Sequence, residues 1–267
     1  MIKLETKNLS FSYTPEKIIL HELNLVLEDK TTGIIGQNGA GKTTFVKLLK
    51  GLLRPSKGSI LFNGEDIENK TVAELSKNIG LVFQNPNDQI FKNTVIDEVM
   101  FGPLNIGYSQ SEAEGLAVQA LSRVGLEEVQ TVNPYDLSLS ERKLISIASI
   151  LAMDTEVIIF DEPTMGQDYE GKELLKKIIQ EEKEKEKLIL CILHDMDFAA
   201  EVFERMIVLN QGRVLLDGAA RDVFSEKEIL EKAFLEQPYA TQIADAMDIS
   251  GTYLNDKELI QTISKSR

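Results

Sequence analysis

The stretch "GQNGAGKTT" at residues 36–44 decides the fold of this chain, because it fits the pattern G-x-x-x-x-G-K-[S/T] of a phosphate-binding loop. The segment before it, "TTGII" (31–35), predicts a strand, and "KTTFVKLLKGLL" (42–53) predicts a helix. Glycines let such a loop wrap closely around phosphate with its N–H groups pointing inward. Because strand, loop and helix occur together, we prefer this interpretation to a chance glycine-rich turn. The residues expected at the phosphates are Gly36, Gln37, Asn38, Gly39, Ala40, Gly41, Lys42, Thr43 and Thr44.

Two adjacent carboxylates follow a second apolar segment, "VIIF" (157–160). Such a run predicts a buried parallel strand, and open α/β sheets bind ligands at the carboxyl ends of their strands. We expect Asp161 to hold Mg²⁺ together with the Thr43 hydroxyl, while Lys42 reaches the β- and γ-phosphates. We expect Glu162 to orient and deprotonate an attacking water. A lone acidic pair would instead indicate two exposed carboxylates in a turn, and the phosphate loop upstream argues against that alternative.

Three further side chains are candidates for the same site. His194 follows the predicted strand "LILCIL" (188–193), so it is expected at the same sheet edge, where an imidazole could contact the terminal phosphate and orient Glu162. Gln84 also ends a predicted strand and could contact Mg²⁺ or the attacking water, although an ordinary turn residue is equally compatible with the pattern. Tyr13 could stack on an adenine face, and its alternative is a core aromatic residue.

The string "DLSLSERK" (136–143) carries the capping-box spacing, with Ser138 and Glu141 three residues apart. An apolar face of helical period follows it, formed by Leu144, Ile147, Ala148 and Leu151. A helix N-terminus is also an anion site. The string by itself therefore leaves open whether it only starts a helix or faces a phosphate.

Composition excludes several classes of function. The chain has 267 residues with 43 acidic and 29 basic side chains, and its net charge of −14 disfavours contact with nucleic acid or anionic lipid. The longest apolar run is about ten residues, too short to span a bilayer. We expect no signal peptide at the N-terminus. The single cysteine, Cys191, predicts a buried reduced thiol in a cytosolic protein. His21 is expected to be structural.

Strand patterns flank a helical middle region. The predicted strands lie near residues 23–28, 31–36, 58–64, 79–84, 156–161, 187–193, 205–210 and 212–218. Helical patterns dominate from about 85 to 155 and again after 220. We therefore predict an α/β sheet interrupted by a helical insertion.

The order of these pieces resembles the ATP-binding-cassette (ABC) ATPases over roughly residues 2–220. The pieces are an aromatic residue, the phosphate loop, a glutamine, the capped helix, "FDEPT" and a histidine. Within that match, "FQNPNDQIF" (83–91) and "DEVMFGPLNIG" (97–107) resemble the ATPases of energy-coupling factor transporters and their cobalt and nickel relatives. Members of that group take up vitamins or metal ions.

The resemblance implies a P-loop NTPase (RecA-like) core with an N-terminal antiparallel β subdomain. It implies an ABC ATPase domain over 1–220, with a helical subdomain inserted at about 85–155. Residues 221–267 would form a helical C-terminal extension that could serve dimerisation. The protein would be an ATPase using Mg²⁺ with ATP. Two nucleotide domains would face each other head to tail around two ATP molecules.

The resemblance also implies partners. The chain would energise uptake through an integral membrane coupling subunit and a substrate-binding membrane subunit, and it would lie peripherally on the cytoplasmic face of the cell membrane. Asp88, Asp97 and Glu98 follow the Gln84 loop and are candidate partners of arginine-bearing helices from the membrane subunit, with ordinary surface charge as the alternative. An ATPase of another ABC importer class and a non-transport ABC ATPase are the other functions considered. No nucleic-acid partner is expected.

One motif departs from the family. Its signature string Leu-Ser-Gly-Gly-Gln caps a helix aimed at the ATP of the other subunit. Here that string is Leu137, Ser138, Leu139, Ser140 and Glu141, so both glycines are replaced, whereas Asp168 of the following dimer loop "MGQD" is kept. We therefore predict a heterodimer with a second ABC ATPase that bears an intact helix. The alternative is that Ser138 and the helix dipole suffice.

Overall fold

The computed structural model describes residues 2–28 and 31–265. The predicted outer domain limits at residues 1 and 267 lie outside the described residues.

An antiparallel sheet in the order β2-β1-β4-β5 forms the N-terminal part of the described chain. Its strands are β1 (Lys3–Thr14), β2 (Lys17–Glu28), β4 (Lys57–Phe62) and β5 (Glu65–Asp66). Leu23, Leu25 and Leu27 of β2 are buried, while the alternating Asn24 and Val26 are exposed. This period of two gives the sheet one face for the core. The predicted antiparallel β subdomain is confirmed.

A second sheet, in the order β10-β9-β3-β8-β7-β6, runs through the middle of the molecule. Its strands are β3 (Thr32–Ile35), β6 (Ile79–Val82), β7 (Val157–Asp161), β8 (Leu188–Ile192), β9 (Arg205–Asn210) and β10 (Arg213–Ala219). All neighbouring pairs are parallel except β10 with β9. The carboxyl ends of β3, β6, β7 and β8 therefore meet at one edge, which brings the predicted site residues together.

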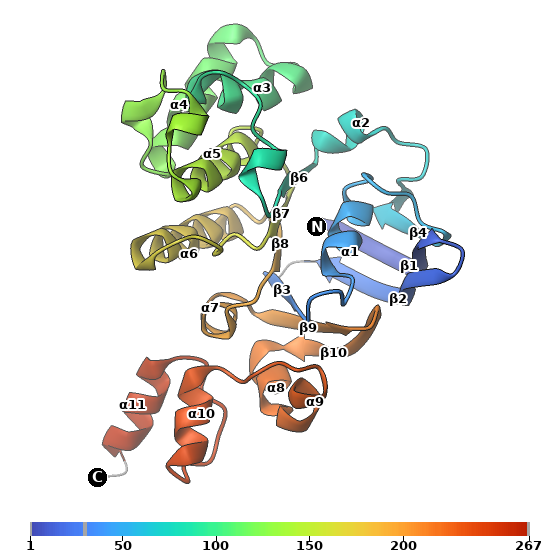
Figure 1. Cartoon of the computed structure of the whole chain (residues 1–267), viewed down its shortest axis with the longest axis vertical. Coiled ribbons are helices and arrows are strands. Elements are labelled where there is room, and N and C mark those ends of the chain that lie inside the picture. The colour runs from blue at the N-terminus through green and yellow to red at the C-terminus, as the bar shows by residue number, and fades with distance from the viewer. Residues whose placement is uncertain (1, 29–30, 266–267) are drawn as a thin grey trace.

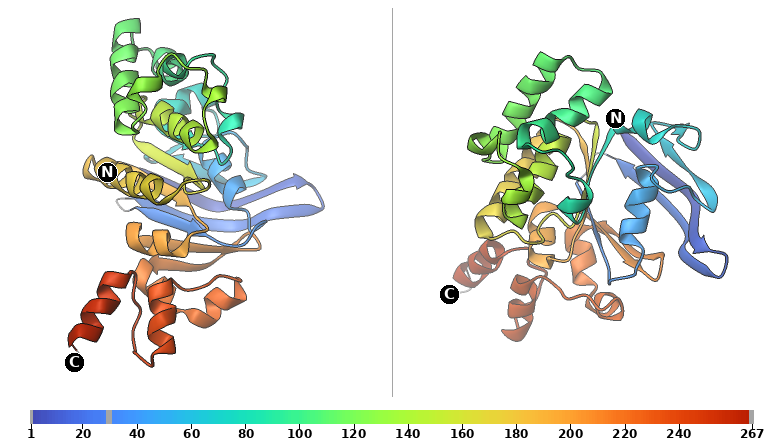
Figure 2. Two further views of the ribbon diagram at one scale, coloured as in Figure 1. Left: turned by 60° about the vertical axis from the view of Figure 1, so that its left-hand side comes forward. Right: turned by 45° about the horizontal axis from the view of Figure 1, so that its top comes forward.

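Helices pack on the faces of this sheet and also lie beyond its two outermost strands, β6 and β10 (Figure 1). The α-helices are α1 (Lys42–Leu49), α2 (Val72–Ser76), α3 (Val95–Ile106), α4 (Gln110–Arg123), α5 (Leu139–Leu151), α6 (Tyr169–Glu184), α7 (Met196–Val202), α8 (Ala220–Ser225), α9 (Lys227–Lys232), α10 (Tyr239–Ala246) and α11 (Asp256–Lys265). Short 3₁₀ turns lie at η1 (Pro86–Asp88), η2 (Glu127–Val129) and η3 (Pro134–Asp136). Helices α3–α5 lie beyond the β6 edge and α8–α11 beyond the β10 edge (Figures 1 and 2).

Two apolar cores lie on opposite sides of the central sheet. Helix α1 buries Phe45, Leu48 and Leu49 in the core that also contains the inner face of the antiparallel sheet. Helices α4, α5 and α6 contribute to the other core. The free thiol of Cys191 is buried there, as predicted, and burial raises its pKa. None of the helices in the described part of the chain has the length and apolar character needed to cross a membrane.

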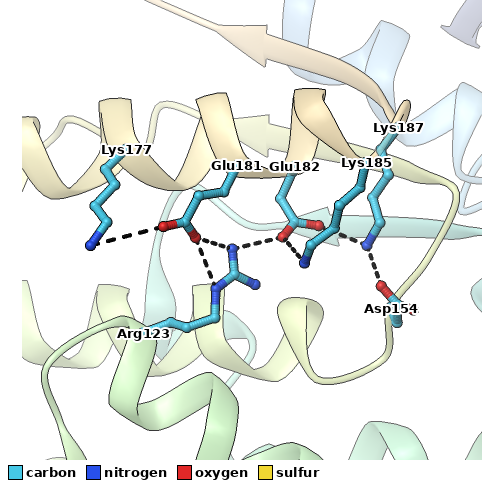
Figure 3. A network of polar contacts seen from close by, with 7 residues as sticks. All are labelled: Arg123, Asp154, Lys177, Glu181, Glu182, Lys185 and Lys187. Atoms are coloured by element: carbon cyan, nitrogen blue, oxygen red, sulfur yellow. Dashed lines mark hydrogen bonds and ion pairs between the residues drawn. The ribbon is translucent and has the colours of Figure 1, made fainter.

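A network of ion pairs connects the inserted helices to the core (Figure 3). Arg123 at the end of α4 contacts the carboxylates of Glu181 and Glu182 on α6 at 2.8 and 2.7 Å. The buried Glu182 also pairs with Lys185 and Lys187 at 2.8 and 2.7 Å. This single carboxylate therefore links helix α4 to α6 and to the residue that precedes strand β8.

Candidate nucleotide-hydrolysis site

The loop between β3 and α1 has the backbone that phosphate binding requires. At Gly36 a Cβ atom would collide with the carbonyl oxygen of Leu209, so no other residue fits there without a backbone shift. Gly39 has φ of 83°, and a Cβ there would meet only open space. The glycines thus serve two needs: Gly36 allows close packing against β9, and Gly39 supplies a left-handed turn on the open side.

Lys42 opens helix α1 with its ammonium folded into this loop. Its Nζ donates to the carbonyl oxygens of Gly36 and Gln37 at 2.6 and 3.1 Å. Burial lowers the pKa of Lys42, and the charges of Glu162 and Asp161 offset part of that effect. A cation held in a loop of inward-facing amides is suited to phosphate oxygens.

Asp161 and Thr43 present two oxygen atoms of the kind that ligate a magnesium ion. The Asp161 side chain is only 2% exposed, and its Oδ1 lies 3.5 Å from Thr43 Oγ1. Burial raises the pKa of Asp161, and the hydrogen bond from Thr43 opposes this only in part. A buried carboxylate beside a hydroxyl fits a hard cation, because oxygen ligands suit Mg²⁺ and the ion's charge would compensate the burial.

Glu162 is held from two sides at the carboxyl end of the sheet. Gln84 Nε2 donates to its Oε2 at 2.8 Å, and His194 Nε2 lies 2.8 Å from its Oε1. The backbone of Glu162 has φ of 50°, and its N–H donates to the Ile192 carbonyl oxygen at 3.1 Å. Such backbone strain concentrates at functional sites. The structure therefore brings together the acid, the amide and the imidazole that the sequence singled out.

Most of the predicted nucleotide-binding residues, together with Gln84 and Glu162, line a cavity of about 490 Å³, within the range of small-molecule sites. Gly36, Ala40, Asp161 and His194 are not among its lining residues. Tyr13 lies on its rim and is 59% exposed, with its hydroxyl 3.4 Å from Thr44 Oγ1. Tyr13 is therefore not a core aromatic residue. Lys17 and Ile19 of β2 also line the cavity. The sequence did not reveal them, because only the packing of the two sheets places β2 beside the loop.

Helix α5 begins as the capping box predicts. Ser138 Oγ accepts from the N–H of Glu141 at 3.2 Å, and Glu141 Oε2 accepts from the N–H of Ser138 at 2.8 Å. Leu139, in the place of the first signature glycine, is 43% exposed. Ser140, in the place of the second, donates from Oγ to Gln167 Oε1 at 2.9 Å. The residues 137–141 do not line the phosphate-loop cavity of their own chain.

The loop after Glu162 joins this helix to α6. Gln167 Nε2 donates to the carbonyl oxygen of Ser140 at 3.3 Å, which completes a two-bond contact between the loop and the start of α5. Asp168 caps α6, because its Oδ1 accepts from the N–H of Gly171 at 2.9 Å. Gln167 was missed from the sequence, since its partner lies 27 residues away.

The three acidic residues beyond the Gln84 loop do not form one set. Asp88 in η1 and Asp97 in α3 are exposed. Glu98 is only 4% exposed, and its Oε2 accepts from the N–H groups of Phe91 and Lys92 at 2.9 and 2.8 Å. The prediction that Glu98 offers charge to a partner is therefore wrong. Its carboxylate holds the loop that precedes α3.

The fold and this site define a P-loop nucleoside triphosphatase. The sequence profile described as "ABC transporter" matches residues 20–165. The energy-coupling factor transporter ATP-binding protein EcfA of Methanocaldococcus jannaschii is 38% identical, over 93% of this chain and 90% of its own length. On these grounds the chain belongs to the ABC transporter family and is an ATPase of that family. The predicted family is confirmed.

Solved structures agree with this assignment. The structure of cbiO1 from Clostridium perfringens, described as part of the ABC transporter complex cbiONQ, is 33% identical. It aligns with a TM-score of 0.76 over 92% of this chain and 98% of that one. The dimeric structure of MJ0796, a bacterial ABC transporter cassette, is 27% identical and gives a TM-score of 0.75 over 82% of this chain and 99% of that one. The predicted fold class is therefore confirmed.

Proposed function

We propose that this chain is the ATP-hydrolysing subunit that energises uptake of a vitamin or a metal ion through a separate membrane protein. The observation that carries the hydrolytic part is Glu162, held between Gln84 and His194 beside the phosphate loop. The transport part is supported by the names of its relatives, an energy-coupling factor ATP-binding protein and a component of the cbiONQ complex.

Each side chain has one task in the proposed reaction. Lys42 and the loop amides bind the β- and γ-phosphates. Thr43, Asp161 and the side-chain amide oxygen of Gln84 would hold Mg²⁺, whose charge would neutralise the phosphates. Glu162 accepts the proton of the attacking water, since each of its oxygens keeps a lone pair beyond the bonds it already accepts. Tyr13, which lines the cavity, would stack on the adenine base.

His194 keeps Glu162 in place. A carboxylate only accepts hydrogen bonds, so the Nε2 atom carries the proton of this contact. The imidazole thereby fixes one oxygen of Glu162 while the Gln84 amide fixes the other. A contact of His194 with the terminal phosphate stays a prediction.

We propose further that the active assembly is a heterodimer with a second ABC ATPase. The support is the start of α5, where Leu139 projects a large exposed side chain and Ser140 is tied to Gln167. A helix end of this form cannot approach a phosphate as closely as two glycines allow. The complete ATP site would then combine the phosphate loop of this chain with the helix of its partner.

The C-terminal helices are proposed to contribute to the dimer. Tyr239 and Ile243 of α10 and Met247, which caps its C-terminus, recur every four residues and are all exposed. Such spacing places them on one face of the helix. A small core of Ala240, Ala244, Tyr253 and Leu259 holds the other face of α10 against α11.

The membrane subunit is proposed to dock beside the Gln84 loop, with Asp88 and Asp97 as its acidic contacts. Both are exposed: Asp88 lies in η1, four residues after Gln84, and Asp97 lies in the first turn of α3. In this arrangement the chain is peripheral on the cytoplasmic face of the membrane.

The test combines purification with two substitutions. The chain is co-expressed with its neighbouring genes, and the complex is assayed for ATP hydrolysis and uptake. Glu162→Gln should retain ATP binding and lower hydrolysis by about 10²-fold or more, and Lys42→Ala should weaken ATP binding itself. Co-purification with an importer for amino acids or sugars would replace the vitamin or metal substrate class. An ATPase that binds no membrane protein would overturn the transport proposal.

A further inference from the structure

A buried ammonium group lies beneath the catalytic edge of the sheet. The side chain of Lys143, which comes from helix α5, is 1% exposed. Its Nζ donates to the carbonyl oxygens of Phe83 and Gln84 at 2.8 Å each and of Asp161 at 3.2 Å. All three N–H groups of the ammonium thus have main-chain partners at the ends of two neighbouring strands.

The three carbonyl oxygens need such a donor because the strand pairing stops there. Strands β6 and β7 pair in parallel as far as Val82 and Phe160. Asp161 then continues along β8, where it pairs with Ile192, while the chain after Val82 turns away toward η1. Buried carbonyl groups are almost always hydrogen-bonded, and here the ammonium of Lys143 replaces the missing ladder.

We infer that Lys143 is a positioning residue for hydrolysis, which holds the Gln84 loop against the end of β7 so that the Gln84 amide reaches Glu162. The inference deepens the proposed function and rests on it, because it assigns Lys143 to the same site. A single hydrogen bond of 2.8 Å, from Gln84 Nε2 to Glu162 Oε2, connects the ends of these two strands. The Lys143 ammonium fixes the backbone on both sides of that bond.

Lys143 acts through these residues and does not bind nucleotide itself. It is buried away from solvent and does not line the phosphate-loop cavity. Burial lowers its pKa to about 8, so the charge is held at an energetic cost at this position. Because Lys143 lies five residues after the cap Ser138 on the same helix, a rigid shift of α5 would move the ammonium and with it the Gln84 loop.

Lys50 provides a matched control, because its ammonium contacts the beginning of strand β6, whereas Lys143 contacts the residues that follow the end of β6. Lys50 is also buried, and burial lowers its pKa to about 8. Its Nζ donates to the carbonyl oxygen of Ile79, the first residue of β6, at 2.5 Å and to Ser76 Oγ at 2.7 Å. Replacing Lys50 therefore removes a similar buried ammonium from β6 but leaves the contacts at Gln84 in place.

The experiment compares Lys143→Met with Lys50→Met in the full chain, and it includes Lys143→Gln, which keeps two N–H donors. The kcat and KM for Mg-ATP are measured in the complex with the partner ATPase. Binding of a non-hydrolysable ATP analogue and amide hydrogen exchange over residues 83–90 are measured on the chain alone. For Lys143→Met we expect kcat to fall about 10²-fold, the effect of a misplacement near 1 Å, with KM within about threefold. Exchange over 83–90 should rise selectively.

Lys50→Met should lose comparable stability but keep kcat within about threefold and keep the protection of residues 83–90. Lys143→Gln should fall between Lys143→Met and the unchanged chain. If Lys143→Met does not fold, Lys143→Gln is compared with Lys50→Gln for the same quantities.

An unchanged kcat in the Lys143 variants, or hydrogen exchange that rises evenly across the core, would overturn the inference. So would failure of both Lys143 variants to fold when Lys50→Met folds, because Lys143 would then serve stability alone. The exchange result stands even if the unchanged chain hydrolyses no ATP, an outcome that would count against the proposed function instead.

Discussion

Glu162 Oε1 lies 2.8 Å from His194 Nε2, and this contact joins the ends of β7 and β8 across the catalytic edge. Together with the Gln84 amide it leaves the carboxylate little rotational freedom before any substrate binds. If Glu162 is the base, as proposed, this preorganisation means that the base needs no reorientation at the moment of reaction.

Replacement of His194 by alanine is expected to lower the ATPase rate by about 10²-fold, because Glu162 loses one of its two holders. Binding of a non-hydrolysable ATP analogue should change little, since the loop and Lys42 provide it. His21→Ala is the control: His21 lies on β2, where its N–H donates to the Gly212 carbonyl oxygen, a main-chain bond that the change retains. Equal rate losses for the two variants would contradict this role of His194.

The sequence predicted the cluster of Gln84, Glu162 and His194 because the position of each residue at the end of a strand can be recognised from its neighbours in the chain. Each of Gln84, Glu162 and His194 follows an apolar strand, and parallel strands align their carboxyl ends. Glu98 was misplaced for the opposite reason. It was chosen because it follows the Gln84 loop in the sequence, and only the three-dimensional path of residues 91–92 brings their N–H groups onto its carboxylate. Lys143 was missed because a lysine beside a capping box predicts an exposed helix start, whereas the strand ends beneath α5 draw it inward.

The buried Glu182 is expected to make stability depend on pH. Burial alone would raise the pKa of Glu182, but hydrogen bonds from Lys185 and Lys187 and the charges of Lys187 and Arg123 outweigh it and leave the pKa lowered. A lowered folded-state pKa contributes stability that is fully present above the unfolded value, about 4.5, and is lost as the pH falls through the folded value.

Glu182→Gln should therefore reduce the free energy of unfolding by about 3 kcal/mol at pH 7, the scale of a broken buried ion pair. The difference from the unchanged chain should shrink as the pH falls below about 4.5. Urea unfolding across that range provides the measurement. Glu186→Gln removes the same charge from an exposed position and should have a small effect at every pH. A Glu182→Gln deficit that stays constant down to low pH would show that lost packing is the cause.

Coupling to the membrane subunit is expected to depend on Asp88 and Asp97. The double change to asparagine should lower substrate uptake while basal ATPase persists, because both carboxylates are exposed and neither contacts the hydrolysis site. Glu98→Gln should act differently. It weakens the hold on the N–H groups of Phe91 and Lys92, so thermal stability should fall. Full uptake by the double variant would argue that apolar contacts hold the membrane subunit.

Restoration of the two signature glycines is expected to raise the rate of ATP hydrolysis by a homodimer of this chain. Leu139→Gly with Ser140→Gly removes the exposed leucine side chain and the Ser140–Gln167 bond at the start of α5. We expect hydrolysis to increase about tenfold, equivalent to about 1.4 kcal/mol of activation barrier. Leu139→Ala with Ser140→Ala is the control, because it shortens the same side chains without the backbone freedom of glycine. Similar rates in the two double variants would show that side-chain size alone matters.

The two ATP sites of the proposed heterodimer are expected to be unequal, and paired substitutions distinguish them. This chain offers a complete half with Lys42, Asp161, Glu162 and His194, but its α5 helix begins with Leu139 and Ser140. The site at its own phosphate loop uses the partner's helix, whereas the partner's phosphate loop must use this one. Glu162→Gln should therefore remove nearly all hydrolysis, and the equivalent change in the partner should cause a modest loss, because the second site binds ATP mainly as a structural element. ATPase rates of the two singly substituted complexes, with ATP bound per complex measured in parallel, test this. Equal losses would show that Ser138 and the helix dipole suffice at the second site, and a stable, fully active homodimer of this chain would exclude the asymmetry altogether.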